Sequence, residues 1–205
     1  AEEDAAGTAE GGDEYVTEPI KWRVLSVDGN DAFLISDRIL DNRRYDEHSE
    51  NPDDSFPEVS WGTSTIRSWL NGYDASENGC GIDYSADSFI DAAFTEEEQE
   101  ALIAAAVDSG ADDKIYLLSA EETMLKKYGF ATDDMHSTTR EAKNTAYTAG
   151  IGGMTYGEGE TDAYWLRSST GGTGCGKHNV RSNGSIDLSG FNYNDTGFGV
   201  RPVLH

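Results

Sequence analysis

The sequence predicts an α+β domain in which short helices surround a small antiparallel sheet. Three patterns point to this class. Residues 20–36 alternate polar and apolar on either side of a turn, as a β-hairpin does. Capping-box sequences at 95–98 and 119–122 each precede apolar residues at helical spacing. Residues 164–204 place strand-like ends around a segment rich in Gly, Ser and Asn, which predicts a large irregular loop region.

Length and composition indicate one folded domain, residues 19–205 of a 205-residue chain. Residues 1–18 are rich in Ala, Gly and acids and predict a flexible acidic tether. Such a tether is what remains when a leader is removed, so we expect an extracellular or cell-surface protein, secreted or held as a lipoprotein. No apolar run approaches the ~20 residues of a membrane span, so we expect no direct membrane insertion.

The chain is strongly acidic, with 15 basic and 39 acidic residues and a net charge of −24. The charge is uneven, because residues 161–205 carry three acids against four bases. Such an acidic chain is a poor partner for nucleic acid or for an anionic membrane surface. We therefore expect a monomer that binds an unknown protein or glycan ligand and no nucleic acid.

The first half is predicted to open with a strand at 21–27, a turn at 28–30 and a returning strand at 32–36. Residues 37–60 are polar and irregular. Their acids lack the regular ligand spacing of an EF-hand, which favours a solvated loop over a calcium site. These acids are Asp46, Glu47, Glu50, Asp53 and Asp54.

Three helices are predicted from caps and apolar spacing. The first, at 64–71, begins at Ser64 and places Ile66, Trp69 and Leu70 on one face. The second follows the capping box at 95–98 and continues through Leu102, Ile103, Ala106 and Val107 to Gly110. The third follows the box at 119–122 and ends at Gly129.

The remaining elements are strands and loops. Residues 114–118 predict a brief strand, and residues 132–159 predict a long covering loop. The strand Trp22–Val27 is expected to pair antiparallel with Val200–Leu204, which would bring the ends of the domain together.

The hairpin at 179–187 can be registered from its turn. A two-residue turn at Asn183 and Gly184 would put Val180 opposite Asp187 and mix a core residue with a charge. A three-residue turn at 182–184 has Gly at the left-handed position and pairs Val180 with Ile186. This register predicts that Val180, Ile186 and Leu188 are buried, and that Asn179, Arg181, Ser185 and Asp187 face solvent.

Aromatic residues and arginines within apolar patterns are predicted to be structural. At least two of Trp61, Trp69 and Trp165 are expected in the core rather than on a sugar-stacking surface. Arg67 and Arg201 are expected to satisfy buried carbonyls or a carboxylate. The full set of structural residues comprises Trp22, Trp61, Arg67, Trp69, Trp165, Arg167 and Arg201.

No motif of a known catalytic site occurs: the sequence lacks a nucleophile elbow, a His-Glu-x-x-His pair and a phosphate-binding loop. Cys80 and Cys175 are too few for a structural zinc site and are either one disulfide or two free thiols. We therefore expect no catalytic residue, no metal and no cofactor.

A series of motifs nevertheless resembles a known family. They are Ile20–Leu25, Trp61–Asn71, Phe94–Glu98, Ile115–Ser119, Tyr164–Ser168 and Gly199–Val203. In this order they resemble an uncharacterised bacterial domain family common in gut Firmicutes. The resemblance implies a C-type-lectin-like fold, related to the formylglycine-generating enzyme and to the variable proteins of diversity-generating retroelements. It also implies paired terminal strands and a loop-rich half that presents ligand-binding residues. The calcium-and-sugar triplets of true C-type lectins are absent, so calcium-dependent sugar binding is not implied.

The main hypothesis is a non-catalytic module, displayed outside the cell, that recognises a protein or a glycan. Its Asn-rich surface suits the variable protein of a diversity-generating retroelement, and it equally suits ordinary turns filled by Gly, Ser and Asn. The alternatives are a formylglycine-type oxidase, with copper bound by Cys80 and Cys175, and a structural module of a larger surface protein. The expected ligand-binding residues are His178, Asn179, Arg181, Asn183, Ser185, Asp187, Asn192, Tyr193 and Asn194. Their replacement is expected to leave stability unchanged.

Overall fold

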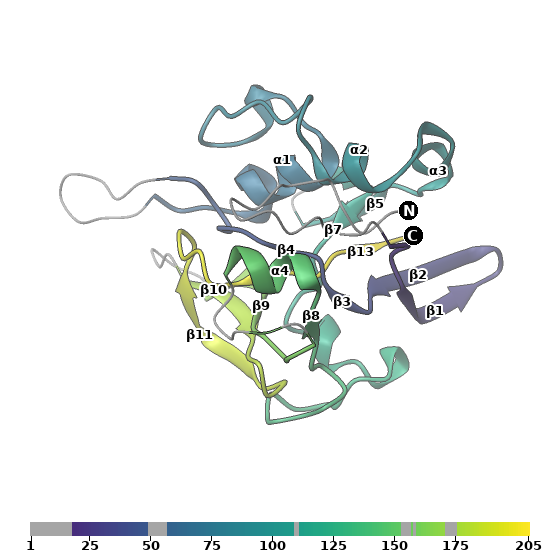
Figure 1. The fold of residues 1–205 in the computed structure, drawn as a ribbon, viewed down its shortest axis with the longest axis vertical. Helices are drawn as coiled ribbons and strands as arrows, with labels where there is room; N and C mark the ends of the chain where they lie inside the picture. The colour runs from purple at the N-terminus through teal and green to yellow at the C-terminus, as the bar shows by residue number, and fades with distance from the viewer. Residues whose placement is uncertain (1–17, 49–56, 109–110, 153–156, 158, 171–175) are drawn as a thin grey trace.

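The computed structural model describes residues 18–48, 57–108, 111–152, 157, 159–170 and 176–205, and it shows a mixed α+β domain with short helices (Figure 1). The predicted tether lies almost wholly outside the described residues. Within the described part of the chain, the strands form a four-stranded sheet, a five-stranded sheet and two short two-stranded ones. The predicted α+β class is therefore confirmed.

The four-stranded sheet has the order β1-β2-β13-β7 and is antiparallel throughout. Its strands are β1 (Trp22–Asp28), β2 (Asp31–Ser36), β13 (Val203–Leu204) and β7 (Ile115–Tyr116). The hairpin β1–β2 and the strand at 115–116 are as predicted. The predicted pairing of the first and last strands is wrong, because β2 lies between them. The reason is burial: both residues of β13 are buried and need a neighbour on each side, whereas β1 exposes Val24 and Val27 as an edge strand does.

The five-stranded sheet has the order β11-β10-β9-β12-β4. Its strands are β4 (Asp41–Asn42), β9 (Tyr164–Ser169), β10 (Gly176–Val180), β11 (Ile186–Asn192) and β12 (Gly199–Val200). The pair β9–β12 is parallel and the other pairs are antiparallel. Since β12 and β13 are separated only by residues 201 and 202, the chain's last residues link the two sheets.

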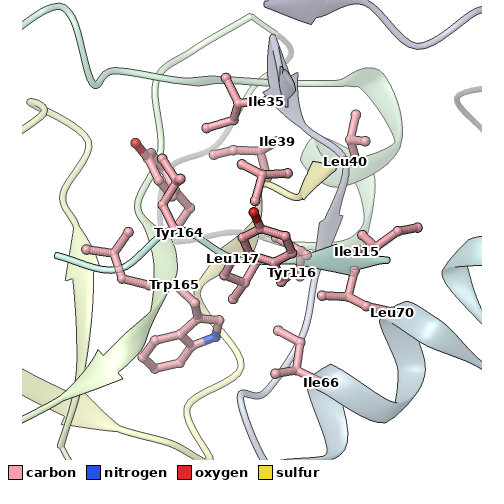
Figure 2. Close-up of a cluster of buried hydrophobic side chains, with 14 of the residues drawn as sticks. Ile35, Ile39, Leu40, Ile66, Leu70, Ile115, Tyr116, Leu117, Tyr164 and Trp165 are labelled. Atoms are coloured by element: carbon pink, nitrogen blue, oxygen red, sulfur yellow. The ribbon is translucent and has the colours of Figure 1, made fainter. Parts of the chain in front are cut away.

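The core fills the space between the two sheets and helix α1 (Thr65–Asn71). Figure 2 shows Ile66 and Leu70 of α1 beside Ile115 of β7, with Tyr164 and Trp165 coming from β9. The helix is the one predicted, and Ser64 caps it by accepting a hydrogen bond from the Arg67 N–H. Trp61, Trp69 and Trp165 are all buried, which confirms the prediction that most of the tryptophans are core residues.

Helix α3 (Glu96–Ala101) is shorter than predicted. Its Thr95–Glu98 capping box forms as expected, but the helix ends at Ala101 and the chain continues as β5 (Ala105–Val107), paired with β6 (Ala111–Asp113). The N–H of Ile103 donates to the carbonyl of His205 (2.9 Å). In a helix that continued to Gly110, the Ile103 N–H would donate to a carbonyl within the helix. Its bond to the His205 carbonyl therefore favours the observed end of the helix at Ala101.

The second capping box also forms its hydrogen bonds, between Ser119 and Glu122, without starting an α-helix. Two 3-10 turns follow, η3 (Glu122–Met124) and η4 (Lys126–Tyr128), and they end at left-handed Gly129 as predicted. The predicted covering loop at 132–159 contains β8 (Lys143–Asn144), parallel to β3 (Arg38–Ile39), and α4 (Ala146–Ile151). The other short helices are η1 (Trp61–Thr63), η2 (Ala75–Glu77) and α2 (Phe89–Ala93).

The β10–β11 hairpin has the predicted register, with Val180 opposite Ile186 and Asn179 opposite Asp187. Its turn depends on Gly184, which has φ 73° and whose N–H donates to the Arg181 carbonyl (2.7 Å). A Cβ atom on Gly184 would lie 1.9 Å from the carbonyl oxygen of Ser137.

We therefore expect Gly184→Ala to destabilise the domain by at least about 1–3 kcal/mol, the cost of a strained backbone position, with the clash added to it. Urea unfolding measures the loss. Gly29→Ala is the matched control, because Gly29 has φ 62° but open space around its Cβ position. Equal losses in the two variants would show that the Ser137 contact costs nothing.

Candidate functional site

The predicted ligand-binding residues do not form one exposed face. Asn179, Asp187 and Tyr193 are buried, with 0%, 4% and 0% of their surfaces exposed. Arg181 and Asn183 are exposed, and the other members are half-buried: His178, Ser185, Asn192 and Asn194. The prediction that Asn179 and Asp187 face solvent is wrong: both are buried, and the Asp187 carboxylate turns back onto Arg181 and Ser189 of its own hairpin. Leu188, expected in the core, is 41% exposed, since the ladder shifts between residues 177 and 179 and breaks the alternation.

Two consequences follow for this hairpin. Asn179 and Tyr193 are buried, so the premise of unchanged stability, that these side chains point to solvent, is wrong for them. Asp187 is also occupied structurally: it accepts hydrogen bonds from Arg181 Nη2 (2.7 Å) and from the Ser189 N–H (3.0 Å). Burial opposes the ionisation of Asp187, but these bonds outweigh it and hold its pKa below the ordinary value.

A hollow of about 400 Å³, here called the Arg167 pocket, lies where β9 passes the start of η1 and the segment after β7. It is lined by Ser60, Trp61, Asp108, Ser119, Glu121, Arg167, Ser168 and Ser169. Sequence reasoning assigned Arg167 and Trp61 structural roles and did not bring these residues together, because they come from four separate segments.

Arg167 is fixed at one wall of this pocket. Its Nε donates to Asp108 Oδ2 (3.0 Å), and its Nη1 donates to the Leu117 carbonyl (2.9 Å) and to Glu122. Burial disfavours the charged guanidinium, but hydrogen bonds and attraction from Glu122 and Asp108 outweigh this and raise the pKa of Arg167. The carboxylates of Asp108, Glu121 and Glu122 outnumber this single cation, so the pocket favours a neutral or cationic ligand over an anion.

Ser168 connects the pocket to one predicted ligand residue. Its Oγ accepts a hydrogen bond from the Ala120 N–H (2.9 Å) and lies 3.1 Å from His178 Nδ1. Burial lowers the pKa of His178, so the ring is neutral near pH 7. The serine therefore ties β9 to β10 and to the segment after β7, and it keeps the pocket floor rigid.

A second cluster lies elsewhere in the fold, and we call it the Asp46–His48–Cys80 cluster. Cys80 Sγ lies 3.2 Å from His48 Nδ1 and 3.4 Å from Asp46 Oδ1. Asp46 Oδ1 and His48 Nδ1 are themselves in hydrogen-bond contact. Three different ligand types thus converge on one point.

The cluster is positioned by backbone contacts at the start of α1. Asp46 is fully buried and its Oδ2 accepts a hydrogen bond from the Thr65 N–H (2.9 Å). The Glu47 N–H donates to Thr65 Oγ1 (3.1 Å), and the Gly79 N–H donates to the Thr63 carbonyl (2.8 Å). The predicted solvated loop is therefore wrong for Asp46, whose burial is decided by these contacts.

The geometry argues against a nucleophilic cysteine. In a catalytic triad the nucleophile and the carboxylate meet opposite nitrogens of the imidazole ring. Here Cys80 and Asp46 both meet Nδ1 of His48. Burial and the neighbouring Asp46 carboxylate also raise the pKa of Cys80 to about 12, so the metal-free side chain is a neutral thiol rather than a reactive thiolate.

Cys80 is a free thiol in the described part of the chain. Cys175 lies outside the described residues. The disulfide and the copper pair each need both cysteines, so both stay predictions. The spacing Asp46-x-His48 is a local signal that sequence reasoning could have used, whereas Cys80 is brought in only by the fold.

The predicted structural residues are largely confirmed. Arg67 is buried and bound to Asp113, and Arg201 is buried and donates to the carbonyls of Ser36 (3.0 Å) and Arg140 (3.2 Å). Trp22 is half-buried and stacks on Phe94. Arg140, which sequence reasoning missed, is wholly buried.

Helices of the described residues are all too short or too polar to cross a membrane. No curated protein and no solved structure matches the chain. A family of domains of unknown function, DUF6273, matches residues 29–205. This match covers the domain from the first hairpin turn to the last strand, and the chain belongs to the DUF6273 family.

Proposed function

We propose that this protein is a non-catalytic binding module that recognises a glycan through the Arg167 pocket. The observation that carries the proposal is the composition of that pocket: one fixed guanidinium, carboxylates, serine hydroxyls and Trp61 line a volume of about 400 Å³. This volume falls within the range of ~300–1,000 Å³ in which small ligands are held.

The chemistry of the lining suits sugar hydroxyls, which both donate and accept hydrogen bonds. Asp108 and Glu121 supply acceptors, Arg167 supplies donors, and serine hydroxyls supply both. The excess of carboxylates favours neutral sugars over sulfated or phosphorylated ones. A concave pocket of this size also suits one end of a glycan better than a protein surface, which needs an interface of roughly 800 Å² per partner.

Display outside the cell and a C-type-lectin-like fold are parts of the same proposal. The variable-receptor version gains less support, because hypervariable positions need to tolerate replacement and Asn179, Asp187 and Tyr193 are buried. The oxidase alternative needs a pair of cysteines, whereas Cys80 lies with an aspartate and a histidine.

The test is a glycan array followed by binding isotherms for the best ligand. Ser169→Trp fills the pocket from an exposed position, and we expect it to weaken binding at least tenfold with an unchanged melting temperature. Leu188→Trp is the matched control, since it places the same indole side chain on the exposed face of β11, outside the pocket.

Loss of binding in the Leu188 variant alone would place the site on the hairpin instead. A wild-type protein that binds no glycan on the array would contradict glycan recognition and favour the structural module.

A further inference from the structure

We propose that Asp46, His48 and Cys80 bind a divalent ion of borderline softness, Zn²⁺ first among them, through Asp46 Oδ1, His48 Nδ1 and Cys80 Sγ. A carboxylate, an imidazole and a thiolate together are a donor set that zinc accepts and that calcium and magnesium do not favour. The site is separate from the Arg167 pocket, with which it shares no residue, so either proposal can fail alone.

The three donor atoms are close enough together to share one ion, and two of the three pairs must move apart when it binds. With bonds of about 2.0–2.3 Å in a tetrahedral site, ligand atoms lie about 3.3–3.8 Å apart. Cys80 Sγ lies 3.2 Å from His48 Nδ1 and 3.4 Å from Asp46 Oδ1. Asp46 Oδ1 and His48 Nδ1 lie closer together because they share a hydrogen bond. A bound ion takes the place of the proton in that hydrogen bond.

Charge balance also favours a divalent cation. The Asp46 carboxylate and the Cys80 thiolate together neutralise a charge of +2, while the imidazole stays neutral. A bound cation itself deprotonates a coordinating thiol, so the neutral thiol of the metal-free protein is no obstacle.

Hydrogen bonds and packing hold the ligand side chains in place, as neighbouring groups do in metal sites. The Asp46 carboxylate is wholly buried, and its two oxygens accept hydrogen bonds from the N–H groups of His48 (3.0 Å) and Thr65 (2.9 Å). The His48 ring packs against Gly79, where a Cβ atom would lie 2.8 Å from Cε1. The missing side chain of Gly79 therefore leaves the room in which the ring can face Cys80.

Among the described residues, the site keeps an open position. The described residues supply three ligands, and the His48 side chain is 27% exposed, so water reaches this edge of the cluster. Three protein ligands with a free position characterise zinc sites in which water or a ligand atom completes the coordination. The ion also ties the segment after β4 to the segment after η2, which adds a cross-link to the domain.

Cobalt substitution tests the proposal on the full chain. The protein is stripped with a chelator, kept reduced with a phosphine, and titrated with Co²⁺ in excess Mg²⁺, which occupies surface carboxylates. We expect one equivalent to bind, with a thiolate-to-cobalt charge-transfer band in the near ultraviolet, and Zn²⁺ to displace it. Cys80→Ser should lose the band and His48→Ala should bind at least tenfold more weakly.

Two variants serve as matched controls. Cys175→Ser and His136→Ala remove the same residue types outside the cluster and should leave the spectrum unchanged. A band that persists in Cys80→Ser, or that disappears in Cys175→Ser, would overturn the assignment.

The wild-type spectrum decides the matter even if a variant fails to fold. Absence of a thiolate band in the folded, reduced wild-type protein at saturating Co²⁺ contradicts the site without reference to any substitution. Co²⁺ binding that lacks the band and that occurs only when Mg²⁺ is left out would show that surface acids alone hold the ion.

Discussion

Replacing Arg67 by alanine is expected to destabilise the domain by about 3–5 kcal/mol, the cost of leaving a buried charge without its partner. Arg67 Nε donates to both oxygens of Asp113, at 2.9 and 3.0 Å, and both residues are buried. Asp113 also accepts hydrogen bonds from Trp61 Nε1 (2.8 Å) and Tyr73 OH (3.0 Å). These neutral donors remain in the variant, but they do not balance the charge of the carboxylate.

Equilibrium unfolding in urea measures this loss. The double variant Arg67→Met, Asp113→Asn removes both charges and keeps a side chain to which Trp61 and Tyr73 can still bind. The double variant should recover a part of the lost stability. The difference between its loss and the sum of the losses in the two single variants defines the coupling free energy between Arg67 and Asp113. A loss below about 1 kcal/mol in Arg67→Ala, the size expected for a surface ion pair, would contradict the role of this pair.

Arg140→Met is expected to cost about 2–6 kcal/mol, because two of its carbonyl bonds, to Gly184 and Thr123, are buried and each buried carbonyl left without a donor costs about 1–3 kcal/mol. The Arg140 guanidinium is wholly buried and donates to the carbonyls of Gly184 (2.7 Å), Ala131 (3.1 Å) and Thr123 (3.4 Å), and to that of Met135. Its nearest carboxylate, on Asp133, is 4.0 Å away and exposed, so the carbonyls matter more than the ion pair.

Native-state hydrogen exchange locates the effect of this substitution. Amides of the β10–β11 turn and of residues 131–140 should lose protection before the rest of the domain, because Arg140 joins these two segments. Arg140→Lys is the control: it keeps the charge, but one ammonium cannot reach four carbonyls, so it should restore less than half of the loss. Unchanged exchange in Arg140→Met would show that the carbonyls find other donors.

Local features of the chain were predictable from sequence. The register of the β10–β11 hairpin follows from a turn that only Gly184 can close, and the caps at Ser64 and Thr95 follow from contacts within three residues. Arg67 was predicted as a buried, bonded arginine because its helix turns Ile66 and Leu70 to the core.

Features that depend on distant segments were not predictable. Whether Asn179 is exposed depends on what packs on the face of the sheet, and its own neighbours in sequence carry no sign of that packing. The end of α3 depends on a hydrogen bond from Ile103 to the last residue of the chain. Asp46 and Cys80 are 34 residues apart, and only the packing of both segments on the start of α1 brings them together.

The most direct measurement of ligand recognition at the Arg167 pocket is a map of amide chemical shifts on titration with the glycan selected from the array. We expect the largest changes at residues 119–121 and 167–169, with the turn at 181–185 unaffected. Changes confined to 181–185 and the exposed face of β11, with residues 167–169 unmoved, would contradict binding in the pocket.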